Sequence, residues 1–302
     1  MSEQRKQHHV PQTYLKNFAA GKKGDSLYTL SKQQRKVYPD RVPEAAAERH
    51  FYTLNNFKDK YFWDDLYTKN IEPEFGKTLQ EIKKVCDNVL VQSDATVISE
   101  KLKHDLVFHL IFQLLRGKQT RKYVKDLYER TLPNAFAKTE EHFKSISKDV
   151  LEKSFEKFQK DDEFFKELSM DAIFSEKVIF SFANILKNYA FVIYKNESEI
   201  PFITSDNPVM IVDSNTLNSR PFSNGLLVPS TVVLFPVSSK LLLCAYHPYK
   251  FSSKGLDCKL KIIHGKDCEN LVSVHNKLQI TQNFNWAYSY SEETLNALKK
   301  FI

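Results

Sequence analysis

Apolar residues follow two different patterns along the chain, and the change falls near residue 189. Between residues 59 and 188 they recur at helical spacing, with few glycines or prolines between them. From Tyr189 onward they form short runs rich in β-branched and aromatic side chains, bounded by Asn, Ser, Pro and Asp. The runs are residues 191–194, 202–204, 209–212, 232–235 and 241–246. The pattern predicts a helical body followed by a sheet.

The two ends of the chain add to this sheet. Residues 26–30 and 35–38 predict a hairpin, because two alternating runs flank a polar turn. Residues 267–279 predict a late helix, and residues 286–290 predict a closing strand.

We therefore expect an α+β fold in which a mainly helical body packs against a mostly antiparallel sheet. The C-terminal third and the N-terminal hairpin would build that sheet. Since no repeat, low-complexity tract or linker interrupts the chain, we expect one interwoven domain over residues 1–302. Its parts would be residues 1–58, residues 59–188 and residues 189–302.

A helix expected over about residues 98–127 is apolar on nearly every side, which predicts that it is buried. Its polar residues are His109, Gln113, Arg116 and Thr120. Offsets of four, seven and eleven place them in one stripe at about 100° per residue.

The arginine in this stripe needs partners, because an unpaired buried charge is very costly. One interpretation is an ion pair between Arg116 and an acidic residue such as Asp206 or Glu72. The other is a polar pocket in which Arg116 binds a phosphate or a carboxylate. The two interpretations are compatible.

Two adjacent histidines near the start, His8 and His9, precede Pro11. Neighbouring side chains on a helix diverge by about 100°, so both reach one site only from an extended segment or a helix start. Pro11 favours a helix start. One histidine could then act as a general acid or base, and we expect His9 to be the one aimed inward.

A cluster of short polar residues, Thr204 to Asn207, stands where a core strand is expected to end. Followed by Pro208, it is typical of a turn. It also supplies donors and acceptors at a position where site residues are common. Asp206 is the candidate for a carboxylate that orients a histidine or holds a metal ion.

Composition narrows the function classes. The chain has 302 residues and a formal net charge of +7, so it should attract polyanions modestly, and nucleic acid is a candidate partner. With only 7 glycines it contains neither G-x-G-x-x-G nor G-x-x-x-x-G-K-[ST], which disfavours a nucleotide cofactor. The sequence has neither H-E-x-x-H nor another tight spacing of metal ligands, so it does not predict a metal site. A divalent metal ion remains an open alternative, and no cofactor is certain.

The four cysteines show no C-x-x-C spacing, so we expect reduced thiols in a cytoplasmic protein, with a structural zinc site as the alternative. No secretory signal and no segment of membrane-spanning length is present in the sequence. We expect no membrane partner, and the oligomeric state is left open.

Several segments together resemble the bacterial family called domain of unknown function 4238. They are H-H-V-P-Q-T-Y-L-K-N-F from residue 8, E-R-H-F-Y-T-L from residue 48, residues 113–121, F-I-T-S-D-N-P-V from residue 202 and L-F-P-V-S from residue 234. The resemblance spans nearly the whole chain. It points to site residues at His8, His9, Glu72, Gln113, Arg116, Ser205, Asp206, Asn207 and Asn276, and to structural residues at Pro11, Tyr14, Phe51, Tyr52 and Pro208. The family pattern has a proline near residues 119–120 that this chain lacks, so we expect the buried helix to continue further here.

The leading hypothesis is a cytoplasmic hydrolase acting on a phosphate-containing substrate, nuclease-like and of the toxin or phage-defence type. His8 or His9 would be the acid or base, Arg116 would stabilise phosphate charge, and Asp206 would orient a histidine or bind a divalent ion. Gln113, Ser205, Asn207 and Asn276 would bind the substrate.

Two alternatives use the same residues. In one, the chain is a non-catalytic binding or sensing module that recognises nucleic acid, a peptide or a phage component. In the other, these residues form a purely structural network joining helices to sheet.

Overall fold

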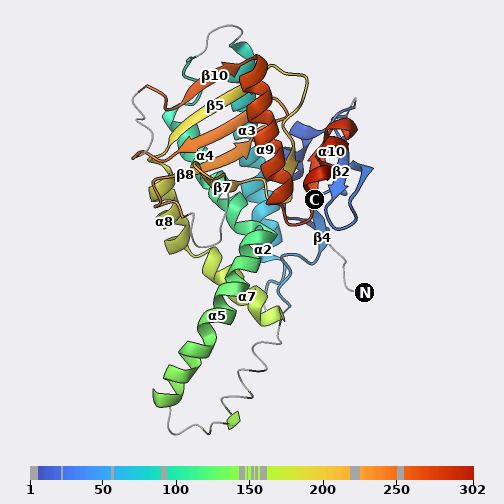
Figure 1. Cartoon of the computed structure of the whole chain (residues 1–302). Coiled ribbons are helices and arrows are strands. Elements are labelled where there is room, and N and C mark those ends of the chain that lie inside the picture. The colour runs from blue at the N-terminus through green and yellow to red at the C-terminus, as the bar shows by residue number, and fades with distance from the viewer. Residues whose placement is uncertain are drawn as a thin grey trace.

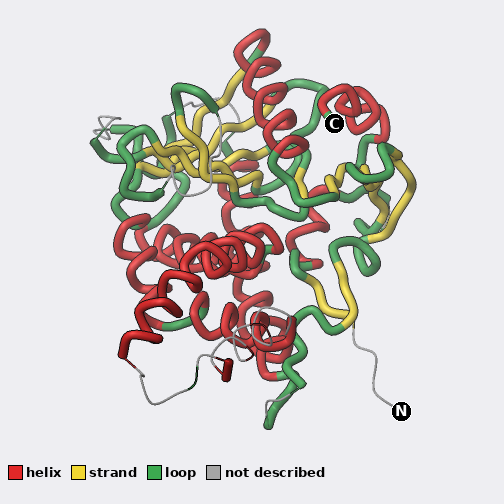
Figure 2. The backbone as a smooth tube through the Cα atoms, turned by 60° about the horizontal axis from the view of Figure 1, so that its bottom comes forward, coloured by secondary structure: helices red, strands yellow, loops and turns green. Residues whose placement is uncertain are grey.

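The computed structural model describes residues 6–302, apart from positions 22, 56–57, 90–93, 143–146, 148, 151–152, 154–155, 157–161, 218–224 and 250–254. Helices dominate the middle of the chain and strands its final third, which confirms the α+β class (Figure 1). The helices gather mainly on one side of the strands (Figure 2).

The middle of the chain is helical, as its apolar spacing predicts. The helices are α2 (Phe62–Leu66), η2 (Tyr67–Ile71), α3 (Glu72–Asn88), α4 (Glu100–Arg116), α5 (Lys118–His142), α7 (Asp162–Ile173) and α8 (Glu176–Leu186). Ser99 and Ser175 begin α4 and α8 as N-caps, since each side-chain oxygen accepts the N–H three residues on. No helix among the described residues is long and apolar enough to cross a membrane.

The larger sheet has five strands in the order β10–β5–β9–β8–β7. They are β5 (Ala190–Asn196), β7 (Met210–Asp213), β8 (Thr231–Pro236), β9 (Leu241–Tyr246) and β10 (Lys259–Ile263). All pairings are antiparallel except that of β10 with β5. The sequence analysis did not predict β10, whose short run of alternating lysines pairs with a strand more than sixty residues away.

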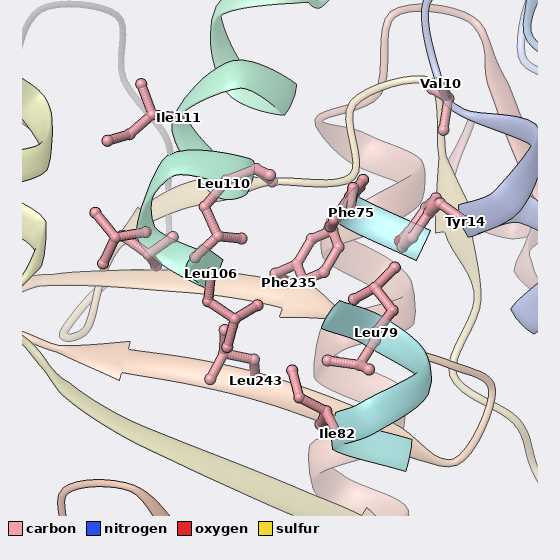
Figure 3. Packing of buried hydrophobic residues seen from close by; sticks show 14 of the residues in the cluster. Val10, Tyr14, Phe75, Leu79, Ile82, Leu106, Leu110, Ile111, Phe235 and Leu243 are labelled. Carbon is pink, nitrogen blue, oxygen red and sulfur yellow. The ribbon is translucent and has the colours of Figure 1, made fainter. Parts of the chain in front are cut away.

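Both faces of this sheet are covered, which explains why its strands are continuous apolar runs. On β8, Val233 and Phe235 belong to the core shared with α3 and α4, whereas Val232 and Leu234 pack with α9 (Gly265–Thr281). Figure 3 shows the first of these layers, with Phe235 among side chains of α3 and α4. In Figure 1, α9 crosses the opposite face.

The predicted hairpin forms, but it belongs to a second sheet. Strands β2 (Ser26–Ser31) and β3 (Lys36–Arg41) are joined by β11 (Trp286–Ser289) and β6 (Thr204–Ser205) in the order β3–β2–β11–β6. The helix α10 (Glu292–Leu298) packs against it, and η3 (Lys299–Phe301) ends the described helices. A third, two-stranded sheet pairs β1 (Lys6–His8) with β4 (Ala47–Arg49).

The long helix predicted over residues 98–127 is in fact two helices. It stops at Arg116, and Gly117 has an extended ψ of 151° before α5 begins at Lys118. Glycine is a poor helix former, and the Thr120 hydroxyl donates to the Leu114 carbonyl, a group that the end of α4 leaves without an intrahelical partner. Thr120 therefore leaves the predicted stripe.

Strand β6 is shorter than the predicted run of residues 202–204. The Ile203 N–H donates to the side-chain oxygen of Asn276 on α9, at 3.0 Å, rather than to a neighbouring strand. The late helix, α9, thus replaces sheet pairing at this point.

Two further histidines, His109 and His275, are buried in apolar surroundings. His275 on α9 is fully buried, with its ring edge-on to Phe202 at 5.2 Å. His109 on α4 stacks on Phe75 at 4.9 Å and is hydrogen-bonded to Thr78. Burial lowers the pKa of each imidazole to about 4, so both rings are neutral at neutral pH.

Because the pKa values of these two histidines are lowered, we expect the fold to lose stability in mild acid. Below the ordinary pKa of 6.5 the unfolded chain binds protons that the folded chain accepts only near pH 4, so stability falls as the pH drops through this window. In His275→Gln the loss between pH 6.5 and pH 4 should shrink by up to about 3 kcal/mol. Urea unfolding at several pH values measures it.

His104→Gln is the matched control, because 71% of the His104 side chain is exposed. It should leave the pH dependence unchanged. Equal pH dependence in wild type and His275→Gln would contradict the assignment of a buried neutral ring.

Candidate functional site

The N-terminal segment passes from β1 into the short helix α1 (Gln12–Leu15) and the turn η1 (Lys16–Phe18). Pro11 occupies the N-cap position of α1, and its carbonyl accepts the N–H groups of Tyr14 and Leu15. The expected helix start near Pro11 is confirmed. The Tyr14 hydroxyl then ties α1 to both sheets, through Thr204 at 2.7 Å and the Pro236 carbonyl at 2.8 Å.

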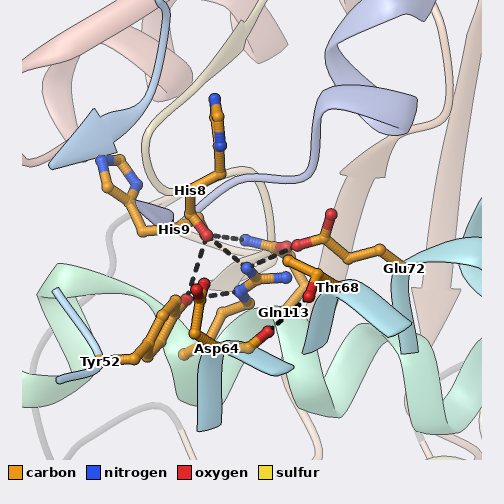
Figure 4. A network of polar contacts seen from close by, with 8 residues as sticks. His8, His9, Tyr52, Asp64, Thr68, Glu72 and Gln113 are labelled. Carbon is orange, nitrogen blue, oxygen red and sulfur yellow. Dashed lines mark hydrogen bonds and ion pairs between the residues drawn. The ribbon is translucent and has the colours of Figure 1, made fainter. Parts of the chain in front are cut away.

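The two imidazole rings of His8 and His9 point in different directions (Figure 4). The His8 ring is partly exposed and lies 3.2 Å from the Pro43 carbonyl. The His9 ring is fully buried, as expected. The extended backbone therefore separates the histidines rather than directing both to one substrate.

Arg116, the last residue of α4, binds the main chain of this segment. Its guanidinium donates to the carbonyl of His8, to the Tyr52 hydroxyl at 2.8 Å and to the Glu72 carboxylate at 2.9 Å. The ring of Tyr67 lies beneath it, 4.1 Å from the guanidinium carbon. Of the two predicted ion-pair partners, the structure uses Glu72.

This arginine is almost fully buried, with 2% of its side chain exposed, and the Glu72 side chain is 13% exposed. Glu72 begins α3 directly after the π-helical turn η2, which also carries Tyr67. A turn of this kind is wider than an α-helical one and often marks a specialised position. Here it brings an aromatic ring and a carboxylate to the same guanidinium.

Gln113, one turn before Arg116, also binds main chain, since its amide nitrogen donates to the His9 carbonyl at 3.1 Å. Gln7, which was not predicted as a site residue, also binds main chain, at Tyr52. Its side chain accepts the Tyr52 N–H and donates to the Thr53 hydroxyl. The Gln113 amide nitrogen, expected to bind substrate, thus has a partner within the protein itself.

The His9 ring lies between two aromatic rings and near cations. Its centroid is 5.4 Å from that of Phe51 and 6.4 Å from that of Trp286, with which it is stacked. Among the described residues neither ring nitrogen has a hydrogen-bond partner. Burial, together with Lys118 and Arg116, holds the pKa of His9 well below its usual value, so the ring is neutral.

Lys118, another residue that was not predicted, contacts one of the two aromatic rings around His9. It pairs with Glu48, and its ammonium lies 4.3 Å from the centroid of the Trp286 ring. Lys118 directly follows the helix break at Gly117, which the apolar spacing of residues 98–127 did not predict.

Among the described residues, Asp206 neither bonds to a histidine nor lies in a group of three His, Cys, Asp or Glu side chains that could hold a metal ion. Its carboxylate accepts the main-chain N–H groups of Phe284, Asn285 and Trp286, at 2.8 to 3.0 Å. Burial raises its pKa to about 6, although these three donors and Lys118 act in the opposite direction. Asp206 thus reaches His9 only indirectly, by fixing the turn that carries the Trp286 ring.

The predicted substrate-binding residues Ser205, Asn207 and Asn276 join a second network along α9. Asn276 donates to the Pro201 carbonyl, and Asn207 donates to the Gln282 carbonyl. Ser205 donates to Gln279, whose amide reaches the Pro208 carbonyl. Gln279 was not predicted. These contacts hold residues 201–208 on α9, and the predicted single site becomes two networks linked through residues 284–286.

The larger cavities share almost no residues with the two networks. The three larger cavities that described residues line have volumes of about 530, 490 and 440 Å³. Of the eight predicted residues, only Asn276 lines any of the three. Within the described part of the chain, no three His, Cys, Asp or Glu side chains form a group that could hold a metal ion.

Comparison with known proteins yields one match. Residues 6–293 match the model of the family described as Protein of unknown function (DUF4238). No curated protein and no solved structure matches the chain.

The contacts of Arg116 predict a large effect on stability. Arg116→Met leaves the Glu72 carboxylate buried without its cation, which should lower the free energy of unfolding by about 3–5 kcal/mol. Adding Glu72→Gln to Arg116→Met should cost less than the sum of the two single substitutions, because the stranded charge is removed. Urea unfolding of the two single variants and the double variant measures this coupling.

Lys77→Met is the matched control on α3. Its partner is Glu74, and both side chains are more than half exposed, so it should change stability by about 1 kcal/mol or less. If Arg116→Met destabilised the fold no more than Lys77→Met, the buried pair would not hold the segment.

Proposed function

The chain belongs to the DUF4238 family, and from the contacts at its candidate site we propose that it is a non-catalytic binding module for nucleic acid. In this proposal Arg116, Gln113 and Asp206 hold the N-terminal segment and the turn around Trp286 in place. The ligand then binds to the surface that this framework supports.

The observation that carries the proposal is that three of the predicted site residues are hydrogen-bonded to the protein's own main chain. Arg116 and Gln113 donate to the carbonyls of His8 and His9, and Asp206 accepts three main-chain N–H groups. A phosphate would have to displace these bonds, and each displacement would leave a buried polar group unpaired. Arg116, Gln113 and Asp206, which the hydrolase hypothesis needs free, are already engaged with the protein's own main chain.

Charge supports nucleic acid as the partner. Lys and Arg number 44 against 37 Asp and Glu, and the sequence pI is about 9.0. Such an excess attracts a phosphate backbone without requiring a sequence-specific site, and salt weakens the attraction. We further propose a cytoplasmic location, whose reducing environment would suit the four free cysteines.

One observation favours a second candidate, a nuclease-like hydrolase of the toxin or phage-defence type. The His9 ring is neutral, and neither of its nitrogens has a partner among the described residues, as a general base requires before it takes a proton. Lys118 beside it could meet a phosphate. The ring is fully buried, however, so Phe51 or Trp286 would have to move before substrate reached it.

One experiment separates the two candidates. Labelled RNA, single-stranded DNA and duplex DNA are incubated with the full chain, with and without magnesium or manganese. The binding module should retain the strands intact, with an affinity that falls steeply as salt increases, because binding releases counterions. Gel retardation reports binding, and denaturing gels report strand length.

His9→Gln serves as the discriminating variant once its melting curve shows that it is folded. The proposal expects its nucleic-acid affinity to equal that of the wild type. Strand cleavage by the wild type that is lost in His9→Gln would establish the hydrolase instead. A failure to retain any nucleic acid at low salt would contradict the proposed partner.

A further inference from the structure

The largest of the three cavities lies between α4 and α8, and no residue of the two networks described above lines it. Its volume is about 530 Å³, within the range of about 300–1,000 Å³ usual for sites that bind small molecules. The turn containing Asp257 and Cys258 closes one end.

One wall of this cavity is aromatic. Phe108 on α4 and Phe180 on α8 meet edge to face, with ring centroids 5.9 Å apart, and His104 lies 5.0 Å from Phe108. Phe180 is 53% exposed although it is a large apolar residue. A flat ring placed against Phe180 would remove this surface from water and gain a stacking contact.

The lining also holds a polar pair, Lys103 and Asp257. Lys103 donates to the Asp257 carboxylate and to the Tyr189 carbonyl, each at 2.8 Å, and its side chain is 14% exposed. Asp257 also accepts the Phe191 N–H, so the carboxylate cannot swing away. A purely apolar ligand would cover this pair without satisfying its remaining hydrogen-bonding capacity.

The charges around the cavity balance. Two lysines, Lys103 and Lys187, and two carboxylates, Glu100 and Asp257, line it. The Lys187 ammonium donates to the side-chain oxygen of Asn184 at 2.9 Å. A phosphate would prefer a surplus of cations. A neutral ring with both donors and acceptors along its edge suits carboxylate, ammonium and amide groups together.

We propose that this cavity binds the base of a nucleoside, with one face of the base against Phe180 and its polar edge toward Asn184 and the Lys103–Asp257 pair. The base could come from a free nucleoside or from a single-stranded nucleic acid. If the base belongs to a single-stranded nucleic acid, the inference rests on the proposed function. If it belongs to a free nucleoside, the inference is independent of that function.

Calorimetric titration of the full chain with adenosine, guanosine, cytidine and uridine tests the proposal. At least one nucleoside should bind saturably at millimolar or lower concentration. Phe180→Ala should weaken that binding by about tenfold or more, as expected for the loss of a stacking ring. The matching nucleoside monophosphate should bind with nearly the same affinity, because no cation surplus awaits its phosphate.

Phe62→Ala is the matched control. Phe62 is 48% exposed and meets Trp63 edge to face, as Phe180 meets Phe108, but it does not line the cavity. It should bind nucleosides as the wild type does. The absence of binding by all four nucleosides, equal affinity in Phe180→Ala, or displacement of the nucleoside by inorganic phosphate would each overturn the proposal.

A single-stranded oligonucleotide identifies the source of the base. Competition with the nucleoside, weakened by Phe180→Ala, assigns the cavity to a nucleic-acid strand, and the absence of competition assigns it to a free nucleoside. Nucleoside binding without oligonucleotide binding would refute the proposed function and leave this inference standing. Oligonucleotide binding without any nucleoside binding would overturn this inference and leave the proposed function standing.

Discussion

The buried guanidinium of Arg116 is the group on which the arrangement of the N-terminal part depends. A charge taken out of water is tolerated only with a full set of partners, and Arg116 finds them in Glu72, the Tyr52 hydroxyl and the His8 carbonyl. Because these partners come from three different segments, satisfying one side chain fixes the relative positions of all three. The position of His9 follows from the same contacts.

The same device recurs at residues 284–286 and along α9, with main-chain groups as partners each time. The Asp206 carboxylate binds three consecutive N–H groups, and Asn276 binds both sides of residues 201–203 through its amide. Buried polar side chains here replace the strand pairing that the irregular turns lack. The buried, neutral rings of His9, His109 and His275 add a sensitivity to acid.

Periodicity predicted much of the fold, because helix and strand patterns depend on neighbours in the sequence. The helical middle, most strands of the larger sheet, the hairpin and α9 all follow from local apolar spacing. The break at Gly117 falls within a stretch whose apolar spacing stays helical, and a local bond from Thr120 to the Leu114 carbonyl accompanies it. Strand β10 depends on pairing with the distant strand β5, which no local pattern records. Sequence reasoning identified Gln113, Arg116 and Asp206 as special but could not tell whether substrate or main chain would be the partner. That distinction is set by which loops pack against them, and the same holds for Gln7, Lys118 and Gln279.

The most direct test of the central claim, that Arg116 anchors the N-terminal segment to the helical body, is amide hydrogen exchange in Arg116→Met under conditions where the variant is folded. The account predicts that protection is lost selectively in residues 6–18 and 47–54, while β7, β8 and α9 keep theirs. Protection unchanged in residues 6–18, or lost equally throughout the chain, would contradict it.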